Sequence, residues 1–135
     1  MTRYAEFHQR SLTDRDGFWA EQAELIDWHR PFDQVCDHSH PPFARWFVGG
    51  QTNLCHNAVD RHLAQRADQA ALICVSTETD TERTYSYREL HAEVQRMAAT
   101  LQSLGVQQGD RVLVYMPMVA QTVFAMLACV RIGAI

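Results

Sequence analysis

The sequence predicts an α/β fold, and residues 84–135 carry most of that prediction. They contain an amphipathic helical pattern, an apolar run of strand length and a second helical pattern. Helices that alternate with apolar strands favour a parallel sheet covered by helices. The second helical pattern is apolar nearly all round, and such a helix needs cover on every side. We therefore expect residues 1–135 to be the N-terminal piece of a larger α/β enzyme; the alternative is a complete small domain.

The first helix of this region has clear signals at both ends. Ser86 is a good N-cap, and Glu89 three residues later completes a capping box. Gly105 suits the left-handed conformation that ends many helices. Between them, apolar residues fall on one face at helical spacing, namely Leu90, Val94, Met97, Ala98, Leu101 and Leu104.

Residues 112–116, with the sequence VLVYM, predict a strand. The run has no polar alternation, which is typical of a strand buried on both faces of a parallel sheet. Pro117 ends it, because proline cannot donate to the ladder. A second helix is predicted from about Val119 to Ile132, and Gly133 lies where that helix must end.

Residues 1–52 have a different pattern from the C-terminal region. Residues 1–30 predict helices with a break at 14–16, and residues 31–52 predict an irregular segment because they hold three of the four prolines and a Gly-Gly pair. This segment is also rich in apolar and aromatic residues, so we expect it to wrap a surface of the larger protein. The residues concerned are Phe32, Val35, Phe43, Trp46, Phe47 and Val48.

Asn53 is a plausible N-cap for a helix over residues 54–66. Its predicted inward face consists of Leu54, Ala58, Val59 and Leu63. Residues 70–75 and 83–85 predict a β-hairpin, joined by a polar turn at 77–82.

Composition excludes several classes of protein. A hydrophobic fraction of 47% with 21% charged residues is typical of a globular chain. The net charge of −4 and the absence of a basic patch argue against nucleic-acid binding. The N-terminus lacks the apolar core of a signal peptide, and no apolar run reaches the roughly 18 residues of a membrane span. We expect a cytoplasmic protein with four reduced cysteines.

Two groups of residues are candidate sites. Zinc at Cys36, His38, His40 and Cys55 is one alternative, but the spacing fits a tetrahedral site poorly, so ordinary loop and helix-cap roles are favoured. The neighbours Asp60, Arg61 and His62 could suggest a carboxylate–histidine pair. Adjacent helical residues do not face each other, so a solvated face with one inward ion pair is the better interpretation.

No phosphate-binding loop and no nucleophile–base pair is found. The patterns themselves therefore identify no reaction, and we expect no catalytic, cofactor-binding or metal-binding residue in this chain.

Several segments resemble a known family: FWAEQAELIDWHRPF, PPFARWFVGGQTNLCHNAVDRHL, TYSYRELHAEV, LGVQQGDRVLVYMPM and AMLACVRIGAI. They are similar to the opening of the AMP-forming acyl-CoA synthetases, in the adenylate-forming superfamily. The resemblance runs from about Phe7 to Ile135 and is strongest to the acetyl- and propionyl-CoA synthetase branch. Within that branch, NLCHNAVDRHL, VSTET and the short leader are more similar to the members that act on propionate than to those that act on acetate.

The resemblance implies a two-step reaction in a parent protein that uses ATP, Mg²⁺ and CoA, with an acyl-adenylate as the intermediate. The family's phosphate loop, acyl pocket and catalytic lysine match nothing in this chain, so the piece alone is expected to bind no cofactor and to be inactive. Residues 1–83 would form the helical and wrapping segment with the start of a β-hairpin. Residues 84–135 would begin the AMP-binding large domain with a helix, a strand and a helix.

A rival hypothesis keeps the fold piece but not the enzyme. In it, the chain is a non-catalytic module whose bare apolar faces are covered by a second copy or a partner. In either case the chain is expected to have apolar surface available for self-association, because a strand at 112–116 would have unpaired edges.

Overall fold

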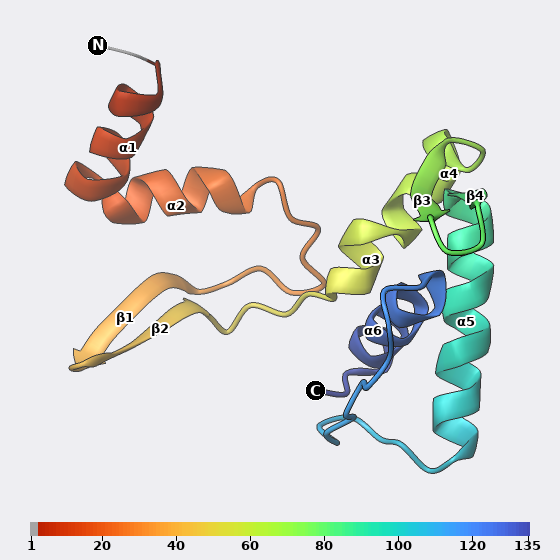
Figure 1. The fold of residues 1–135 in the computed structure, drawn as a ribbon. Helices are drawn as coiled ribbons and strands as arrows, with labels where there is room; N and C mark the ends of the chain where they lie inside the picture. The colour runs from red at the N-terminus through yellow and green to blue at the C-terminus, as the bar shows by residue number, and fades with distance from the viewer. Residues whose placement is uncertain (1–2) are drawn as a thin grey trace. The chain divides into compact units, whose positions relative to one another are not determined.

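The computed structural model describes residues 3–135, which form two units (Figure 1). The first unit ends at Thr52, and the second runs from Asn53 to Ile135. Each unit contains one two-stranded antiparallel sheet with its own helices.

Two helices open the first unit, as predicted. Helix α1 spans Arg3–Thr13 and α2 spans Arg15–Ala23. The break between them is Asp14, whose side chain caps α2 by accepting a hydrogen bond from the Gly17 amide at 3.3 Å. A carboxylate at this position satisfies an amide of the first turn that has no partner within the helix.

The prediction of an irregular segment at 31–52 is wrong. Strands β1 (Gln34–His40) and β2 (Phe43–Val48) form an antiparallel hairpin there. The prolines do not interrupt its ladder, because Pro31 precedes β1 and the pair Pro41-Pro42 occupies the turn. Proline disrupts a strand only where its missing amide would donate.

Aromatic rings hold the first unit together. Phe18 is buried, and the Phe7 ring meets it edge-on with 4.7 Å between centroids. The rings of Trp28, Phe32 and Phe47 form a second cluster with centroids 5.1–5.5 Å apart. Edge-to-face and tilted pairs at these distances stabilise a small core beyond the area they bury.

The second unit begins with a broken helix rather than the single helix predicted for 54–66. It consists of α3 (Leu54–Ala58), the 3₁₀ turn η1 (Asp60–His62) and α4 (Leu63–Arg66). Asn53 caps α3 as predicted, by accepting a hydrogen bond from an amide of the first turn. The break lies at Val59, whose φ and ψ of −128° and −62° are not helical.

The inward face of this segment also differs from the prediction. Val59 is buried as predicted and Cys55 is buried as well, whereas Leu54 and Ala58 are exposed. The buried face is therefore shifted by one residue from the predicted one. Residues four apart still share a face, as helical geometry requires.

The predicted hairpin and the predicted capped helix are both confirmed. Strands β3 (Ala70–Ser76) and β4 (Thr81–Ser86) pair antiparallel. Helix α5 (Tyr87–Ser103) begins with the full Ser86–Glu89 capping box. It ends at Gly105, which takes the left-handed φ of 90°, and the next amide returns to the last turn of the helix in a Schellman motif.

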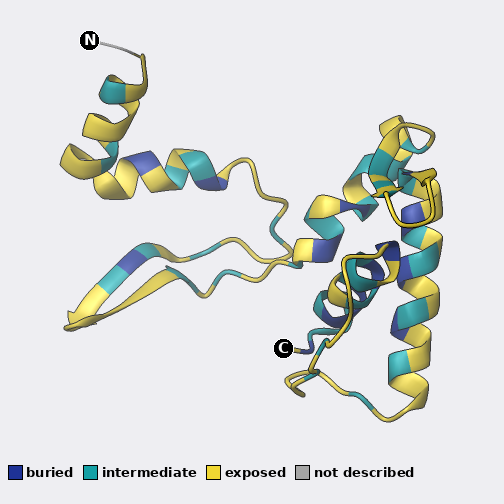
Figure 2. Cartoon of the chain, in the orientation of Figure 1, coloured by how far each residue is buried: buried dark blue, intermediate teal, exposed yellow. Residues whose placement is uncertain are grey.

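Helix α6 spans Ala120–Ile132, close to the prediction, and is followed by Gly133 at φ 76°. It packs beside α5, and the core of the second unit lies between these helices, α3 and the β3–β4 hairpin (Figure 2). Within residues 3–135, no helix is both long and apolar enough to cross a membrane. The buried core comprises Cys55, Val59, Tyr85, Leu90, Val94, Ala98, Ala120, Phe124 and Ala128.

Two predictions about the end of α5 and the following run are wrong. Leu104 was expected on the inward face but is 76% exposed, because it follows the last helical residue. The run Val112–Met116 is not a strand in this structure. The side chains of Leu113 and Tyr115 are 91% and 96% exposed. An apolar run becomes a strand only when another strand satisfies its backbone.

The capping box predicts a specific acid sensitivity. The Glu89 carboxylate accepts a hydrogen bond from the Ser86 amide at 2.8 Å, and this bond lowers the pKa of Glu89 from its usual 4.5. A lowered pKa in the folded state gives stability above the unfolded value that is lost as the pH falls through the folded value. We expect Glu89→Gln to reduce the loss of stability below pH 4.5, measured by urea unfolding.

Ser86→Ala serves as the companion variant. It removes the other half of the box and should lower the free energy of unfolding at neutral pH by about 1 kcal/mol. Equal acid sensitivity of the wild type and Glu89→Gln would contradict the role of this carboxylate.

Candidate functional site

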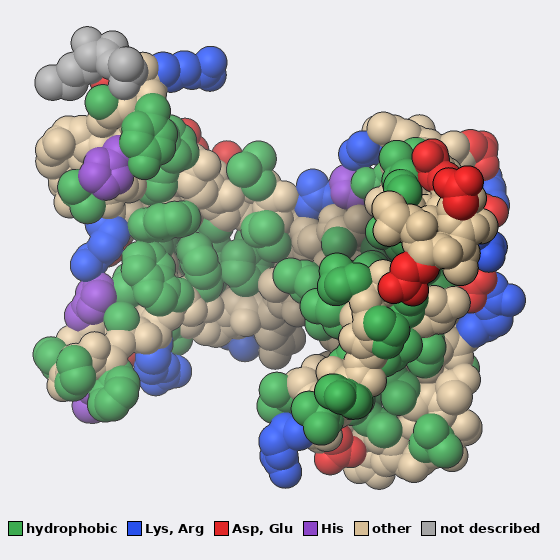
Figure 3. Space-filling model, in the orientation of Figure 1, with side chains coloured by type: hydrophobic (Ala, Val, Ile, Leu, Met, Phe, Trp, Pro, Cys, Tyr) green, Lys and Arg blue, Asp and Glu red, His purple; other side chains and the backbone are tan. Residues whose placement is uncertain are grey.

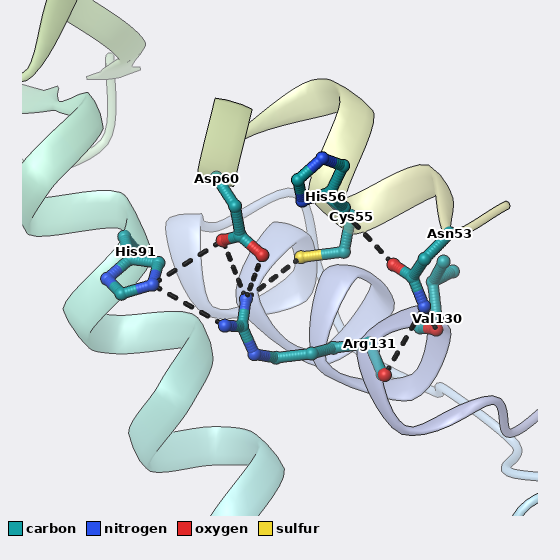
Figure 4. Close-up of polar contacts among 7 residues, drawn as sticks. All are labelled: Asn53, Cys55, His56, Asp60, His91, Val130 and Arg131. Carbon is teal, nitrogen blue, oxygen red and sulfur yellow. Dashed lines mark hydrogen bonds and ion pairs between the residues drawn. The ribbon is translucent and has the colours of Figure 1, made fainter. Parts of the chain in front are cut away.

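A polar cluster around Arg131 lies within the second unit (Figure 4). Arg131 belongs to the last turn of α6, and its Nη1 lies 2.8 and 3.0 Å from the two carboxylate oxygens of Asp60. The same Nη1 lies 3.6 Å from Cys55 Sγ, and Nη2 lies 3.4 Å from His91 Nε2. One guanidinium therefore joins α6 to α3, η1 and α5.

The cluster is largely withdrawn from water. The side chains of Arg131, Asp60 and His91 are 25%, 23% and 21% exposed. Burial acts to lower the pKa of Arg131, but its hydrogen bonds to Asp60 and Cys55 and the charge of Asp60 outweigh burial, so the pKa is raised. The guanidinium is thus a permanent cation, which the Asp60 carboxylate neutralises.

His91 has a defined place in this network. Its Nε2 atom faces the guanidinium of Arg131, which only donates hydrogen bonds. The same Nε2 lies 3.4 Å from Asp60 Oδ1. His91 therefore lies between the cation and the carboxylate of the cluster.

The cysteines near the cluster are poor nucleophiles. Burial raises the pKa of Cys55, and this effect exceeds the opposing hydrogen bond from Arg131. Burial likewise raises the pKa of Cys129. The thiolate is the reactive form of cysteine, so both thiols remain protonated and unreactive at neutral pH.

Asn53 makes a second connection to the end of α6. Its Oδ1 caps α3, while its Nδ2 donates to the carbonyl oxygens of Val130 and Arg131 at 2.9 and 3.3 Å. The last carbonyls of a helix have no partner within it. One side chain therefore satisfies the start of α3 and the end of α6 together.

The structure separates the neighbours Asp60, Arg61 and His62, as expected for adjacent residues. Asp60 makes the inward ion pair, Arg61 donates to Asn57 Oδ1 at 2.8 Å, and the His62 ring lies 5.2 Å from the Tyr87 ring. Sequence reasoning missed Arg131 and His91. Arg131 had a usable signal, since it is the one charge in an apolar helix and such a charge needs a partner.

The zinc alternative gains no support from the geometry. Cys36 Sγ contacts His38 Nε2 at 3.0 Å, while the His40 ring pairs with Ser39. Cys55, in the other unit, contacts Arg131 instead. Over residues 3–135, no group of three or more His, Cys, Asp and Glu side chains is placed to hold a metal ion.

The same finding bears on the Mg²⁺ that the family resemblance implies. The residues described offer no set of carboxylates to hold it. An open depression of about 500 Å³ does lie between the β3–β4 hairpin and the residues before α6. Its walls include Arg83, Thr81 and Met118, but Met118 is 97% exposed, so the depression is not an enclosed ligand site.

Comparison with known families divides the chain in two. Residues 4–58 match the sequence model described as the acetyl-coenzyme A synthetase N-terminus. Residues 59–135 match that of the AMP-binding enzymes. The junction lies close to the structural boundary between Thr52 and Asn53.

Individual relatives agree with the family match. The chain is 61% identical over 132 residues to the propionate–CoA ligase of Salmonella typhimurium and 48% identical over 134 residues to an acetyl-coenzyme A synthetase of Pseudomonas putida. Each alignment covers 98% of this chain and 21% of the relative. The acetoacetyl-CoA synthetase of Streptomyces lividans has a similar structure, with a TM-score of 0.90 and 34% identity over 100% of this chain and 21% of that one. The chain thus spans about a fifth of the length of these relatives.

The cluster makes a prediction about stability. Asp60→Ala would leave the largely buried Arg131 cation without its carboxylate, so the free energy of unfolding should fall by about 2 kcal/mol. Asp68→Ala is the matched control, because its ion pair with Arg88 has side chains that are 86% and 67% exposed. That change should cost less than about 0.5 kcal/mol. Urea unfolding followed by circular dichroism measures both, and equal losses would contradict a special role for Asp60.

Proposed function

The chain belongs to the family of AMP-binding enzymes, and we propose that it is the N-terminal part of an AMP-forming ligase that joins propionate to CoA. The observation that carries the proposal is the high similarity, over nearly the whole chain, to propionate–CoA ligases. Acetate is the alternative acid, because acetyl-coenzyme A synthetases are also close relatives.

The proposed reaction of the parent protein has two steps. An oxygen of the propionate carboxylate attacks the α-phosphate of ATP and displaces pyrophosphate, which gives an acyl-adenylate. The CoA sulfur then attacks the acyl carbonyl carbon and displaces AMP, and the thiol proton passes to solvent or to a base. ATP, Mg²⁺ and CoA are thus the proposed cofactors and substrates of the parent, and none is assigned to residues of this chain.

Within that parent we propose a structural role for the chain. In the polar cluster around Arg131, the cation is paired with the Asp60 carboxylate. Burial raises the pKa values of the Cys55 and Cys129 thiols, so both remain protonated. Residues 1–83 are proposed to wrap the large domain and residues 84–135 to begin it. A cytoplasmic location for the parent remains a prediction from the sequence.

We also propose that the isolated chain self-associates. Large apolar side chains lie on the surface of both units (Figure 3), and the exposed run before α6 is the most extreme example. Exposed apolar surface of this kind favours association in water. The most exposed of these side chains are Tyr4, Phe43, Leu104, Leu113, Tyr115 and Met118.

The function is tested by ATP–pyrophosphate exchange. The parent protein should exchange labelled pyrophosphate into ATP in the presence of propionate, and more efficiently than with acetate. The 135-residue chain should give no exchange above a buffer blank, because it lacks the groups that stabilise charge on the transferring phosphorus. Exchange by the isolated chain would overturn the structural role, and a parent without propionate-dependent exchange would overturn the reaction.

Self-association is tested by light scattering on a gel-filtration column. We expect a mass above that of the 15.5 kDa monomer, rising with protein concentration. The double variant Leu113→Ser, Tyr115→Ser should shift the equilibrium toward monomer, because it removes exposed apolar surface without disturbing the core. A compact monomer at all concentrations would refute the proposal.

A further inference from the structure

Strand β1 brings a thiol and an imidazole together in the first unit. Residues two apart in a strand lie on the same face, and Cys36 Sγ is 3.0 Å from His38 Nε2. This is the arrangement of a nucleophile beside a base. Spacing in the sequence did not identify the pair, because residues 31–52 were predicted to be irregular and only a strand places residues two apart on one face.

The pair lies at the boundary between the interior of the unit and water. Cys36 is 4% exposed and has Trp46 opposite it on β2, whereas His38 is exposed. Asp37, the residue between them, lies on the other face of the strand and accepts a hydrogen bond from the Ser39 amide at 2.9 Å. The imidazole can therefore exchange protons with solvent, while the sulfur is shielded from large reagents.

The other three cysteines provide an internal comparison. Burial raises the pKa of Cys55 and of Cys129, which disfavours their reactive thiolate forms. Cys74 on β3 is half-buried, and it is more exposed than the other three, which are all buried. Exposure alone therefore ranks Cys74 as the most reactive thiol, whereas a neighbouring base favours Cys36.

A second nucleophile and imidazole lie beside the first pair. Ser39 Oγ is 2.8 Å from His40 Nδ1. A serine hydroxyl is a weak nucleophile, while a thiol is intrinsically a strong one. The chemistry of the hairpin therefore centres on Cys36.

We propose that Cys36 is the reactive thiol of this chain and a site of covalent modification by small, uncharged carbon electrophiles. The sulfur attacks the electrophilic carbon, and the leaving group departs with the electrons of its bond to that carbon. The thiol proton passes to His38 Nε2 as the carbon–sulfur bond forms, and the exposed imidazole then releases it to water. The electrophile is small because little of Cys36 is exposed, and uncharged because a charge is costly to withdraw from water.

Iodoacetamide is the probe, with iodide as the leaving group. The folded chain is alkylated near neutral pH, and the rate at each cysteine is measured by peptide mass spectrometry. We expect Cys36 to react about 10-fold faster than the more exposed Cys74, because the effect of the base exceeds that of shielding. In urea all four thiols should react at similar rates, since the preference belongs to the fold. Equal or faster reaction of Cys74 in the folded chain would overturn the proposal.

A variant of the base tests its role directly. His38→Gln keeps a side chain that can form a hydrogen bond with the thiol but is not a base. It should slow alkylation of Cys36 by about 100-fold, the lower end of the effect of a positioned base, and leave the rate at Cys74 unchanged. Cys74 then becomes the faster of the two. The same Cys36 rate in the wild type and in His38→Gln would contradict the proposal.

His40→Gln is the matched control. The His40 ring pairs with Ser39 and not with Cys36, so this change should leave both rates unchanged. Equal slowing of Cys36 by both substitutions would show a general effect on the hairpin and count against a base at His38. Circular dichroism checks that each variant folds, and the comparison of Cys36 with Cys74 in the wild type decides the matter if either does not.

Discussion

The single charge of helix α6 is the constraint on which the second unit depends. Arg131 lies in an otherwise apolar helix, and a cation withdrawn from water must find an anion close by. Asp60 provides it from a segment 71 residues away, and His91 of α5 contacts the same guanidinium. Since Asn53 binds the last carbonyls of the same helix, the end of α6 is fixed from two sides. Residue Ile135, which follows α6 after a short connection, forms backbone hydrogen bonds with Asp110 and Val112.

Where local chemistry decides the structure, the sequence was sufficient to predict it. The Ser86–Glu89 box and the left-handed Gly105 depend only on residues within a turn of each other, and both features are as expected. The β3–β4 hairpin is similarly local, because its strands are joined by a short polar turn. In each case the partners that satisfy the backbone are neighbours in the chain, so spacing alone identifies them.

The incorrect predictions concern segments whose structure depends on contacts that the local sequence pattern does not show. The hairpin at 34–48 was missed because prolines were counted rather than placed outside the ladder. The helix at 54–66 is broken at Val59, and its buried face follows the fit of Cys55 against other helices. The candidate cluster shows the same limit: a lone arginine in an apolar helix signals that a carboxylate is needed, but not that Asp60 supplies it. The family resemblance rests on long stretches of similar sequence and not on any reactive group.

The proposed function and the fixed end of α6 are linked through the geometry of parallel sheets. Ligands of open α/β sheets bind beyond the carboxyl ends of the strands, so the position of each strand sets the position of the loop that follows it. Arg131 and Asp60 touch no substrate in this scheme, yet they hold the helix that leads to Ile135. A shift of that helix would move every backbone group that follows. The ion pair therefore fixes where α6 ends, because a largely buried charge allows little freedom in where its partner lies.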